Sequence, residues 1–334
     1  MQSSIFTLRA LILAIGAVAF IALPASLRAQ ADADPKYPSK PVRFIIPAPP
    51  GGANDIIARI VAAQLSERTG QPFVVDNRPG ATGNLAAEIV VRAAPDGYTM
   101  HVGNATIFIV NAYLFQNLPF VASRDTVPGA MMAQITNGIA VPGNSPFKSI
   151  PELLAYARAN PGKLNYGSGG NGTTAHLFAE LLKARTGTNL VHVPFKGAGP
   201  MLTELIAGRI DVAIENLPVI LPAAKTGQLR ILAVTSGETW PLAPELPTLQ
   251  SQGVQNFNIL SWFGLFLPAK TPRVILDRLN AHVNAAVRDP ETIRKLEGIG
   301  ARPMHGDVNE ITAFIARDRQ NWVDAVKASG AKVD

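Results

Sequence analysis

The sequence of 334 residues contains no cysteine. A chain without cysteine has no disulfide framework, no thiol nucleophile and no thiolate metal site, and no lipid-modified cysteine can follow its N-terminal segment. The five histidines show none of the spacings that bind a metal ion. We therefore expect a protein that holds neither a metal nor a cofactor.

Long hydrophobic runs are also missing beyond the first thirty residues, where none approaches the ~20 apolar residues of a membrane span. The exception is the run 10–23, which follows Arg9 and precedes small residues at Ala29 and Ala31. This layout is typical of a secretory signal peptide, whose apolar core is too short to cross a bilayer. A signal anchor is the alternative. We predict a signal peptide at residues 1–31 and a periplasmic protein, in keeping with the lack of cysteine.

No strong charge of one sign is present. The formal net charge is +6, of which Arg9 and Arg28 in the leader contribute +2, which leaves 6 − 2 = +4 for the rest. Basic and acidic residues alternate, as in 289–295, and no basic stripe is interleaved with aromatic residues. Nucleic acid is therefore not an expected partner. A mild positive charge is compatible with small anionic ligands.

What the chain does have is alternating strand and helix patterns separated by short breakers. Apolar segments at 42–46, 73–75 and 99–102 read as strands, and the helical patterns 54–69 and 85–92 lie between them. From residue 149 the alternation begins again, with helices, strands and glycine-rich turns of similar length. The sequence predicts an α/β protein with two such units and mostly parallel sheets.

Two apolar, β-leaning stretches, 130–141 and 257–267, flank the second unit. We predict that each crosses between two lobes, although each could instead be an edge strand of its own lobe. On this topology, the first lobe comprises 37–135 plus 255–334 and the second lobe comprises 136–254. The region 273–328 is mostly helical and is expected to pack on the outside.

Four glycine-rich loops stand at strand-to-helix junctions: "PAPPGGAND", "NRPGATGN", "GSGGNGTTAH" and "FKGAGP". A helix N-terminus offers free N–H groups and a partial positive charge, and glycine lets an anion approach them. In open α/β sheets such junctions face the crevice at the carboxyl ends of the strands. A single such loop is also an ordinary turn, and none fits the P-loop or dinucleotide-binding motif. Together the four predict a cleft lined with N–H donors.

Catalytic patterns are weak. Tyr166 stands where a G-x-S-x-G motif requires glycine, which argues against Ser168 as a nucleophile. We therefore expect a binding protein and not an enzyme, and an exported hydrolase that uses Ser168 and His176 is the less favoured rival hypothesis. His176 could instead reach a bound anion, or simply cap or pack on its helix.

The charged and polar residues near the loops each allow two interpretations, a contact with the ligand or a purely structural role. Asp55 either touches the ligand or stabilises the first turn of its helix electrostatically. Lys196 is either a charge partner of the ligand or a solvated lysine. Glu215 and Asn216 either enter the crevice or end their strand in solvent.

The segments "YPSKPVRFIIPAPPGGANDIIAR", "VDNRPGATGN", "APDGYTMHVGN", "LNYGSGGNGTTAHL", "VHVPFKGAGPMLTELIAGRIDVAIEN" and "LRILAVTS" resemble the extracytoplasmic solute-binding proteins of tripartite tricarboxylate transporters, also called Bordetella uptake proteins. The resemblance covers nearly the whole chain after the leader. It implies a two-lobed periplasmic binding protein (Venus flytrap) fold that closes over a small carboxylated ligand. It also implies a monomer that delivers this ligand to a membrane permease with one large and one small integral subunit. A subunit that presents its ligand to a membrane sensor kinase would have the same fold.

The resemblance also implies which residues bind the ligand, through backbone amides and hydroxyls of the glycine loops. One wall would contain Gly51, Gly52, Asn54, Asp55, Asn84 and Asn104. The other wall would contain Ser168, Gly169, Thr173, Thr174, Pro194, Lys196, Glu215 and Asn216. This sequence has Ala48 where many members have a bulky aromatic residue, which leaves the identity of the acid open.

Overall fold

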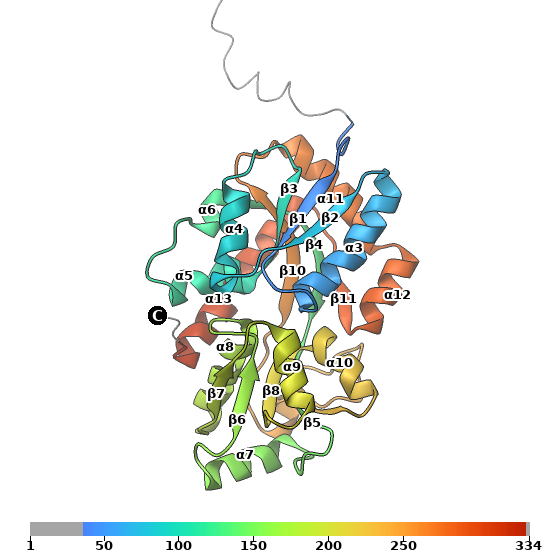
Figure 1. The fold of residues 1–334 in the computed structure, drawn as a ribbon. Helices are drawn as coiled ribbons and strands as arrows, with labels where there is room; N and C mark the ends of the chain where they lie inside the picture. Colours follow the sequence, from blue (N-terminus) through green and yellow to red (C-terminus); the bar gives the residue numbers. More distant parts are fainter. Residues whose placement is uncertain (1–35, 332–334) are drawn as a thin grey trace, which may run out of the picture.

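The computed structural model describes residues 36–331. Two β-sheets, each flanked by helices, form two lobes that are stacked one above the other in Figure 1. The signal peptide predicted at residues 1–31 lies outside the described residues. Within the described range, every helix is too short or too polar to cross a membrane.

The first lobe contains a six-stranded sheet in the order β11-β4-β10-β3-β1-β2. Its strands are β1 (Val42–Ile46), β2 (Phe73–Asn77), β3 (Thr99–Asn104), β4 (Thr126–Ile135), β10 (Ser261–Pro268) and β11 (Ala301–Pro303). Its helices are α3 (Ala53–Thr69), α4 (Asn84–Val91), α5 (Asn111–Leu114), α6 (Ala122–Asp125), α11 (Arg273–Val287), α12 (Pro290–Gly298) and α13 (Val308–Ser329), with short turns η1 (Ala81–Gly83) and η2 (Thr106–Val110). The apolar side chains that predicted β1 and α3, such as Phe44 and Ile57, are fully buried between sheet and helices.

The second lobe contains a five-stranded sheet in the order β7-β6-β8-β5-β9. Its strands are β5 (Asn137–Pro142), β6 (Asn165–Ser168), β7 (Val191–Pro194), β8 (Val212–Asn216) and β9 (Leu229–Val234). Its helices are α7 (Ile150–Ala159), α8 (Thr174–Thr186), α9 (Ala198–Ile206) and α10 (Leu217–Lys225), followed by the turn η3 (Gln250–Gln252). The predicted α/β class with two sheets is confirmed. The expectation of mostly parallel sheets is wrong, because β4, β5, β9, β10 and β11 all pair antiparallel with their neighbours.

The chain crosses between the lobes twice. It passes directly from β4 to β5 at Thr136, and it returns between β9 and β10. The two crossings lie side by side, because the backbone N–H of Asn137 donates to the Thr235 hydroxyl (3.1 Å) and the N–H of Ile259 donates to the Thr235 carbonyl (3.2 Å). The two predicted crossing segments are thus confirmed, with a single residue separating the two sheets at the first crossing. The lobe boundaries at 135/136 and 254/255 stay a prediction.

The last helix differs from the expectation that the C-terminal region packs only on the outside. The ring of Trp322 in α13 stacks on Phe178 of α8 in the second lobe, with centroids 5.5 Å apart. The indole N–H groups of Trp262 and Trp322 both donate to one oxygen of Asp318, each at 2.8 Å. Helix α13 therefore connects the two lobes a third time, and Figure 1 shows it at the level where they meet.

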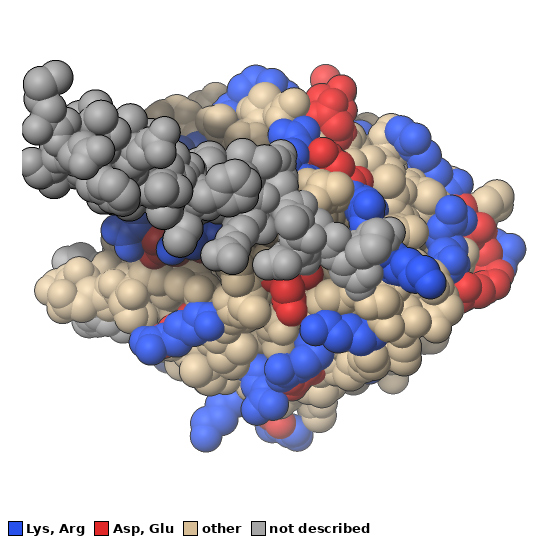
Figure 2. All heavy atoms as spheres, turned by 90° about the horizontal axis from the view of Figure 1, so that it is seen from above, with Lys and Arg blue, Asp and Glu red and all other residues tan. Residues whose placement is uncertain are grey.

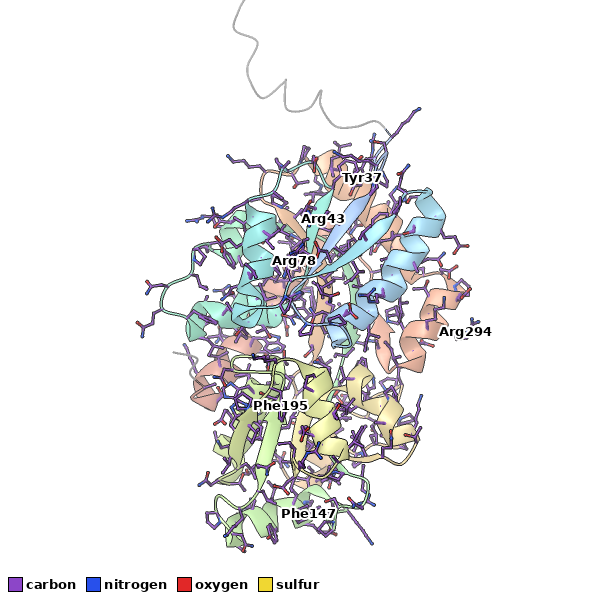
Figure 3. All side chains as sticks on the ribbon, viewed as in Figure 1. Tyr37, Arg43, Arg78, Phe147, Phe195 and Arg294 are labelled. Carbon is purple, nitrogen blue, oxygen red and sulfur yellow. The ribbon has the colours of Figure 1, made fainter. Side chains whose placement is uncertain are left out.

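The parallel strands of both sheets point their carboxyl ends at the boundary between the lobes. Strand β1 pairs in parallel with β2 and β3, and β6 pairs in parallel with β7 and β8. Figure 3 makes the polarity of the second lobe visible: Phe195, just after β7, lies at the end that faces the first lobe, and Phe147 lies at the far end. The loops that follow these strands therefore meet between the lobes.

The surface carries charges of both signs. On the face shown in Figure 2, basic and acidic side chains are interspersed. Many form exposed ion pairs, such as Arg273 with Asp277 (2.8 Å) and Lys295 with Glu291 (2.7 Å), which are separated by one helical turn. Such exposed pairs contribute little to stability individually.

Candidate functional site

A cavity of about 580 Å³ lies between the lobes. All four glycine-rich loops contribute to its lining, through residues 47–49, 52–54 and 79–83 of the first lobe and residues 169–171, 173–175 and 196–198 of the second. Apolar side chains of Ile107 and Phe115 complete the first-lobe wall. The volume suits a small organic molecule, since ligand pockets usually measure about 300–1,000 Å³.

Helix N-termini surround this cavity. The N-cap residues of α3, α4, α8, α9 and α10 all line it, and they are Gly52, Gly83, Thr173, Gly197 and Asn216. The first N–H groups of each helix lack intrahelical partners, and the helix dipoles add partial positive charge at the same point. Five N-termini that converge on one cavity create an environment that favours an anion.

The structure brings together most of the residues that the sequence suggested. Nine of the fourteen line the cavity: Gly52, Asn54, Asn104, Gly169, Thr173, Thr174, Lys196, Glu215 and Asn216. The other five, Gly51, Asp55, Asn84, Ser168 and Pro194, are not among the lining residues. These five lie directly behind or beside the lining loops, and four of them hold the loops in place through hydrogen bonds.

Asp55 fixes the loop that precedes α3. Asp55 is 3% exposed, and its carboxylate accepts from the Gly51 N–H (3.0 Å) and pairs with Arg59 (2.9 Å). Asn77, at the end of β2, donates both to Asp55 (3.0 Å) and to the Ala48 carbonyl (2.9 Å). Burial by itself raises the pKa of Asp55, but hydrogen bonds from Arg59, Gly51 and Asn77 outweigh it and lower the pKa, so Asp55 is ionised at neutral pH. The electrostatic alternative considered for Asp55 thus fits its position.

Ser168 supports the glycine loop of the second lobe. Its hydroxyl lies 2.7 Å from Nε2 of His192 and also accepts from the Gly170 N–H (3.2 Å). His176, which the hydrolase hypothesis paired with Ser168, instead accepts at Nδ1 from the Gly172 N–H (3.1 Å) and stacks on His192. Burial lowers the pKa of His192 to about 4. Ser168 is fully buried, so its hydroxyl is not presented to the cavity.

Thr173 has a structural role beside its position in the lining. Its hydroxyl donates to the Gly170 carbonyl (2.8 Å) and accepts from the His176 N–H (3.4 Å), which caps α8. Asn84 is bonded to Asn111 (2.6 Å) at the start of α4 in the same supporting way. The first-lobe and second-lobe loops are therefore preorganised by their own side chains.

The lobes contact one another around the cavity. The hydroxyls of Thr106 and Thr174 lie 2.9 Å apart, and the Thr82 hydroxyl donates to the Asn171 carbonyl (3.0 Å). Gly197 approaches Pro49 so closely that a Cβ atom there would lie 2.8 Å from the proline ring. The structure thus has the lobes closed over the cavity.

Several residues of the cavity wall were not recognised in the sequence, among them Thr82, Thr106 and Phe115. Thr82 and Thr106 come from the loops after β2 and β3, and Phe115 comes from the segment after α5. Thr82 lies inside the loop "NRPGATGN", so its loop was identified although the residue was not. Thr106 and Phe115 follow no motif, and only the tertiary structure brings them to the cavity.

Within the part of the chain that the structure describes, no group of three His, Asp or Glu side chains is placed to hold a metal ion. The charged residues of the cavity wall are Lys196 and Glu215. The arrangement offers backbone N–H groups, hydroxyls and amides to a ligand, which is chemistry for binding.

Comparisons with known proteins agree with this geometry. The tripartite tricarboxylate transporter family receptor model matches residues 57–331. The UPF0065 protein in the tcbD-tcbE intergenic region of Pseudomonas sp. strain P51 is 37% identical over 287 residues, which cover 86% of this chain and 85% of that protein.

Solved structures are similar as well. The structure of R. palustris Rpa4515 with adipate has a TM-score of 0.85 and 36% identity, covering 89% of this chain and 100% of that one. MatC (Rpa3494) from Rhodopseudomonas palustris with bound malate has a TM-score of 0.81 and 28% identity, covering 87% of this chain and 100% of that one. Adipate and malate each carry two carboxylate groups.

Proposed function

The chain belongs to the tripartite tricarboxylate transporter receptor family, and we propose that it captures a small carboxylated anion by hinged closure of its two lobes. The observation that carries this proposal is the convergence of five helix N-termini on one closed cavity. A ligand carboxylate placed there neutralises several dipole ends at once.

The energetics support binding by main-chain donors. A hydrogen bond to a charged group contributes on the order of 1.5–3 kcal/mol, and each helix dipole adds about 0.3–1 kcal/mol. Three or four such contacts account for the roughly −8 kcal/mol of micromolar affinity after the cost of ordering. Lys196 is the basic side chain of the wall, and it adds attraction without forming a bidentate clamp.

The ligand-binding residues of this proposal are the nine sequence-identified residues in the cavity wall together with Thr82, Gly83, Thr106, Gly197 and Ala198. The five remaining residues of the sequence-based set act behind the wall. Ala48 lies in the wall and has a small side chain. The cavity therefore has room for a ligand that extends beyond a single carboxylate group. Adipate and malate, the ligands of the two solved relatives, are the first acids to test.

We further propose that the protein works in the periplasm after removal of residues 1–31 and delivers its ligand to a membrane permease with one large and one small integral subunit. The family supports this partner. Mass spectrometry of the exported protein would reveal the cleavage site. Genes for such a permease beside this gene, rather than genes for a sensor kinase, would support delivery over sensing.

Differential scanning fluorimetry against a panel of carboxylic acids tests the central proposal. A ligand that binds only the folded state raises the melting temperature, and a concentration 100 times its Kd adds about 2.7 kcal/mol. At least one acid in a panel that includes adipate, malate, hydroxy acids, amino acids and aromatic acids should stabilise the protein. No shift with any acid, for correctly folded protein, would contradict the proposal.

A further inference from the structure

Glu215 is the acidic side chain among the described residues that line the cavity. It stands at the carboxyl end of β8, and only 3% of its surface is exposed. One carboxyl oxygen, Oε1, accepts from the Asn216 backbone N–H (2.7 Å) and from the Asn216 amide (2.6 Å). Within residues 36–331 no group bonds the second oxygen, Oε2, so this oxygen is left for a ligand.

A carboxylate in this wall conflicts with the function of the cavity. An ionised Glu215 would repel an anionic ligand, and two carboxylates that share a site cannot both remain ionised without a large cost. We propose that Glu215 takes up one proton when the cavity closes around an anion, and that its neutral carboxyl group donates a hydrogen bond from Oε2 to the ligand. This inference rests on the proposed function. The proton comes from solvent, and no bond of the ligand changes.

The neighbours of β8 offer Glu215 little charge compensation. Strand β5 contributes no ionisable group, and the ionisable residues on the other elements packed against β8 are Tyr166 of β6, His176, Glu180, Lys183 and Arg185 of α8, Glu204 of α9 and Lys225 of α10. Glu204 is paired with Arg209, and Lys225 donates to the Gly298 carbonyl. Glu180 is paired with Lys183. Lys196 is the basic group in the same cavity wall, and it forms no ion pair with Glu215.

Helix α8 lies on the opposite face of the sheet from Glu215. Residues Val212 and Ile214 of β8 pack in the same core as α8, whereas Ala213 packs in the core with α9 and α10. Side chains alternate along a strand, so Glu215 shares the face of Ala213. The histidine and lysine of α8 therefore do not face Glu215.

Burial raises the pKa of Glu215, against the two hydrogen bonds from Asn216 that lower it. A bound anion nearby raises this pKa further, because it disfavours the charged form of Glu215. The complex therefore binds more protons than the free protein at pH values between the pKa of free Glu215 and its higher pKa in the complex. By linkage, affinity for the anion falls as the pH rises through that range, by up to about tenfold per pH unit.

Isothermal titration calorimetry with adipate, or with malate if adipate does not bind, tests the inference between about pH 6.5 and 9. Both acids are fully ionised there, since carboxylic acids titrate near pH 4. Titrations in two buffers that differ in ionisation enthalpy measure proton uptake directly. We expect uptake of up to one proton per ligand by the wild-type protein, and an affinity that falls with rising pH.

Glu215→Gln keeps the shape of the side chain and its ability to donate, but it cannot titrate. We expect this variant to bind the same acid with no proton uptake and with an affinity that does not change over this pH range. Glu204→Gln on the exposed face of α9 is the matched control and should keep the wild-type pH dependence. Circular dichroism of each variant verifies that it is folded.

Three results would overturn the inference. Wild-type binding without proton uptake at any pH in the range would show that Glu215 does not change its protonation state. Equal proton uptake by Glu215→Gln would assign the proton to another group. A folded Glu215→Gln that no longer binds would show that an ionised carboxylate is required. If no acid binds to the wild-type protein, the proposed function fails and the role of Glu215 fails with it. If an acid binds without proton uptake, only the role of Glu215 fails.

Discussion

Replacing Gly197 by alanine places a methyl group where the two lobes meet. The added Cβ would lie 2.8 Å from Cγ of Pro49 and 3.3 Å from its Cδ. Carbon atoms in contact are usually separated by about 3.5–4.0 Å, so the proline ring and its loop must retreat. Pro49 belongs to the first lobe and Gly197 to the second, so this collision exists only when the lobes are closed.

Two costs follow, and they fall on different states of the protein. Gly197 has φ of 112°, a conformation that alanine adopts only with strain, and this strain of about 1–3 kcal/mol acts within the second lobe whether the lobes are open or closed. The collision adds about 1–3 kcal/mol to the closed state alone, as overpacking does elsewhere. Closure accompanies ligand binding in our proposal, so affinity should fall by about 5- to 150-fold.

Calorimetry with an acid that binds to the wild-type protein measures this loss, and thermal unfolding without ligand measures the strain. Gly199→Ala is the matched control in the same helix, because a Cβ there meets nothing within 4 Å and alanine favours helix. Pro49→Ala in the Gly197→Ala protein removes the two ring atoms that collide and should restore much of the affinity. Unchanged affinity in Gly197→Ala would refute the reasoning, since the closed contact would then be absent from the ligand complex.

Asp318→Ala leaves the indole N–H groups of Trp262 and Trp322 without their acceptor. The free energy of unfolding should fall by about 1–3 kcal/mol for each group that stays unpaired. Urea unfolding measures this loss, and the exposed Asp324→Ala is the control. His101 is buried with both ring nitrogens unpaired, and burial lowers its pKa to about 3. Between about pH 6.5 and 3 the unfolded state then binds one more proton than the folded state, so stability falls as the pH drops, by up to about 1.4 kcal/mol per pH unit. His101→Leu should flatten this slope when unfolding is measured from pH 7 to 4. An unchanged slope would show that His101 does not cause it. Thr173→Val removes the cap of α8 and should cost about 0.5–2 kcal/mol of stability together with affinity, whereas Thr173→Ser should preserve both in the same assays.

The glycine loops were predictable because their cause is local. A chain that follows a strand with "PAPPGG" and then an amphipathic helix must turn within a few residues. The helix then presents free N–H groups whatever surrounds it. Helix α10 was missed for an equally local reason: Pro218 and Pro222 interrupt its pattern, although proline at the first turn of a helix is well tolerated. Its N-terminus nevertheless adds Asn216 to the cavity wall.

The residues that do not reach the cavity illustrate the limit of motif reasoning. Asp55 and Ser168 stand inside the right loops, each next to a lining residue, yet their side chains turn into the protein. Which way a loop side chain points depends on partners distant in sequence, such as Asn77 for Asp55 and His192 for Ser168. No local pattern contains those partners.

The sequence by itself determined the α/β alternation, the two crossings between the lobes and the positions of four glycine-rich helix starts, because periodicity and turn chemistry act over a few residues. Only the tertiary structure decided that these helix starts share one cavity, that α13 joins the lobes through Trp322, and that Glu215 is buried in the wall of that cavity. Each of these outcomes depends on contacts between segments far apart in the chain, whose geometry is set by the packing of the two sheets.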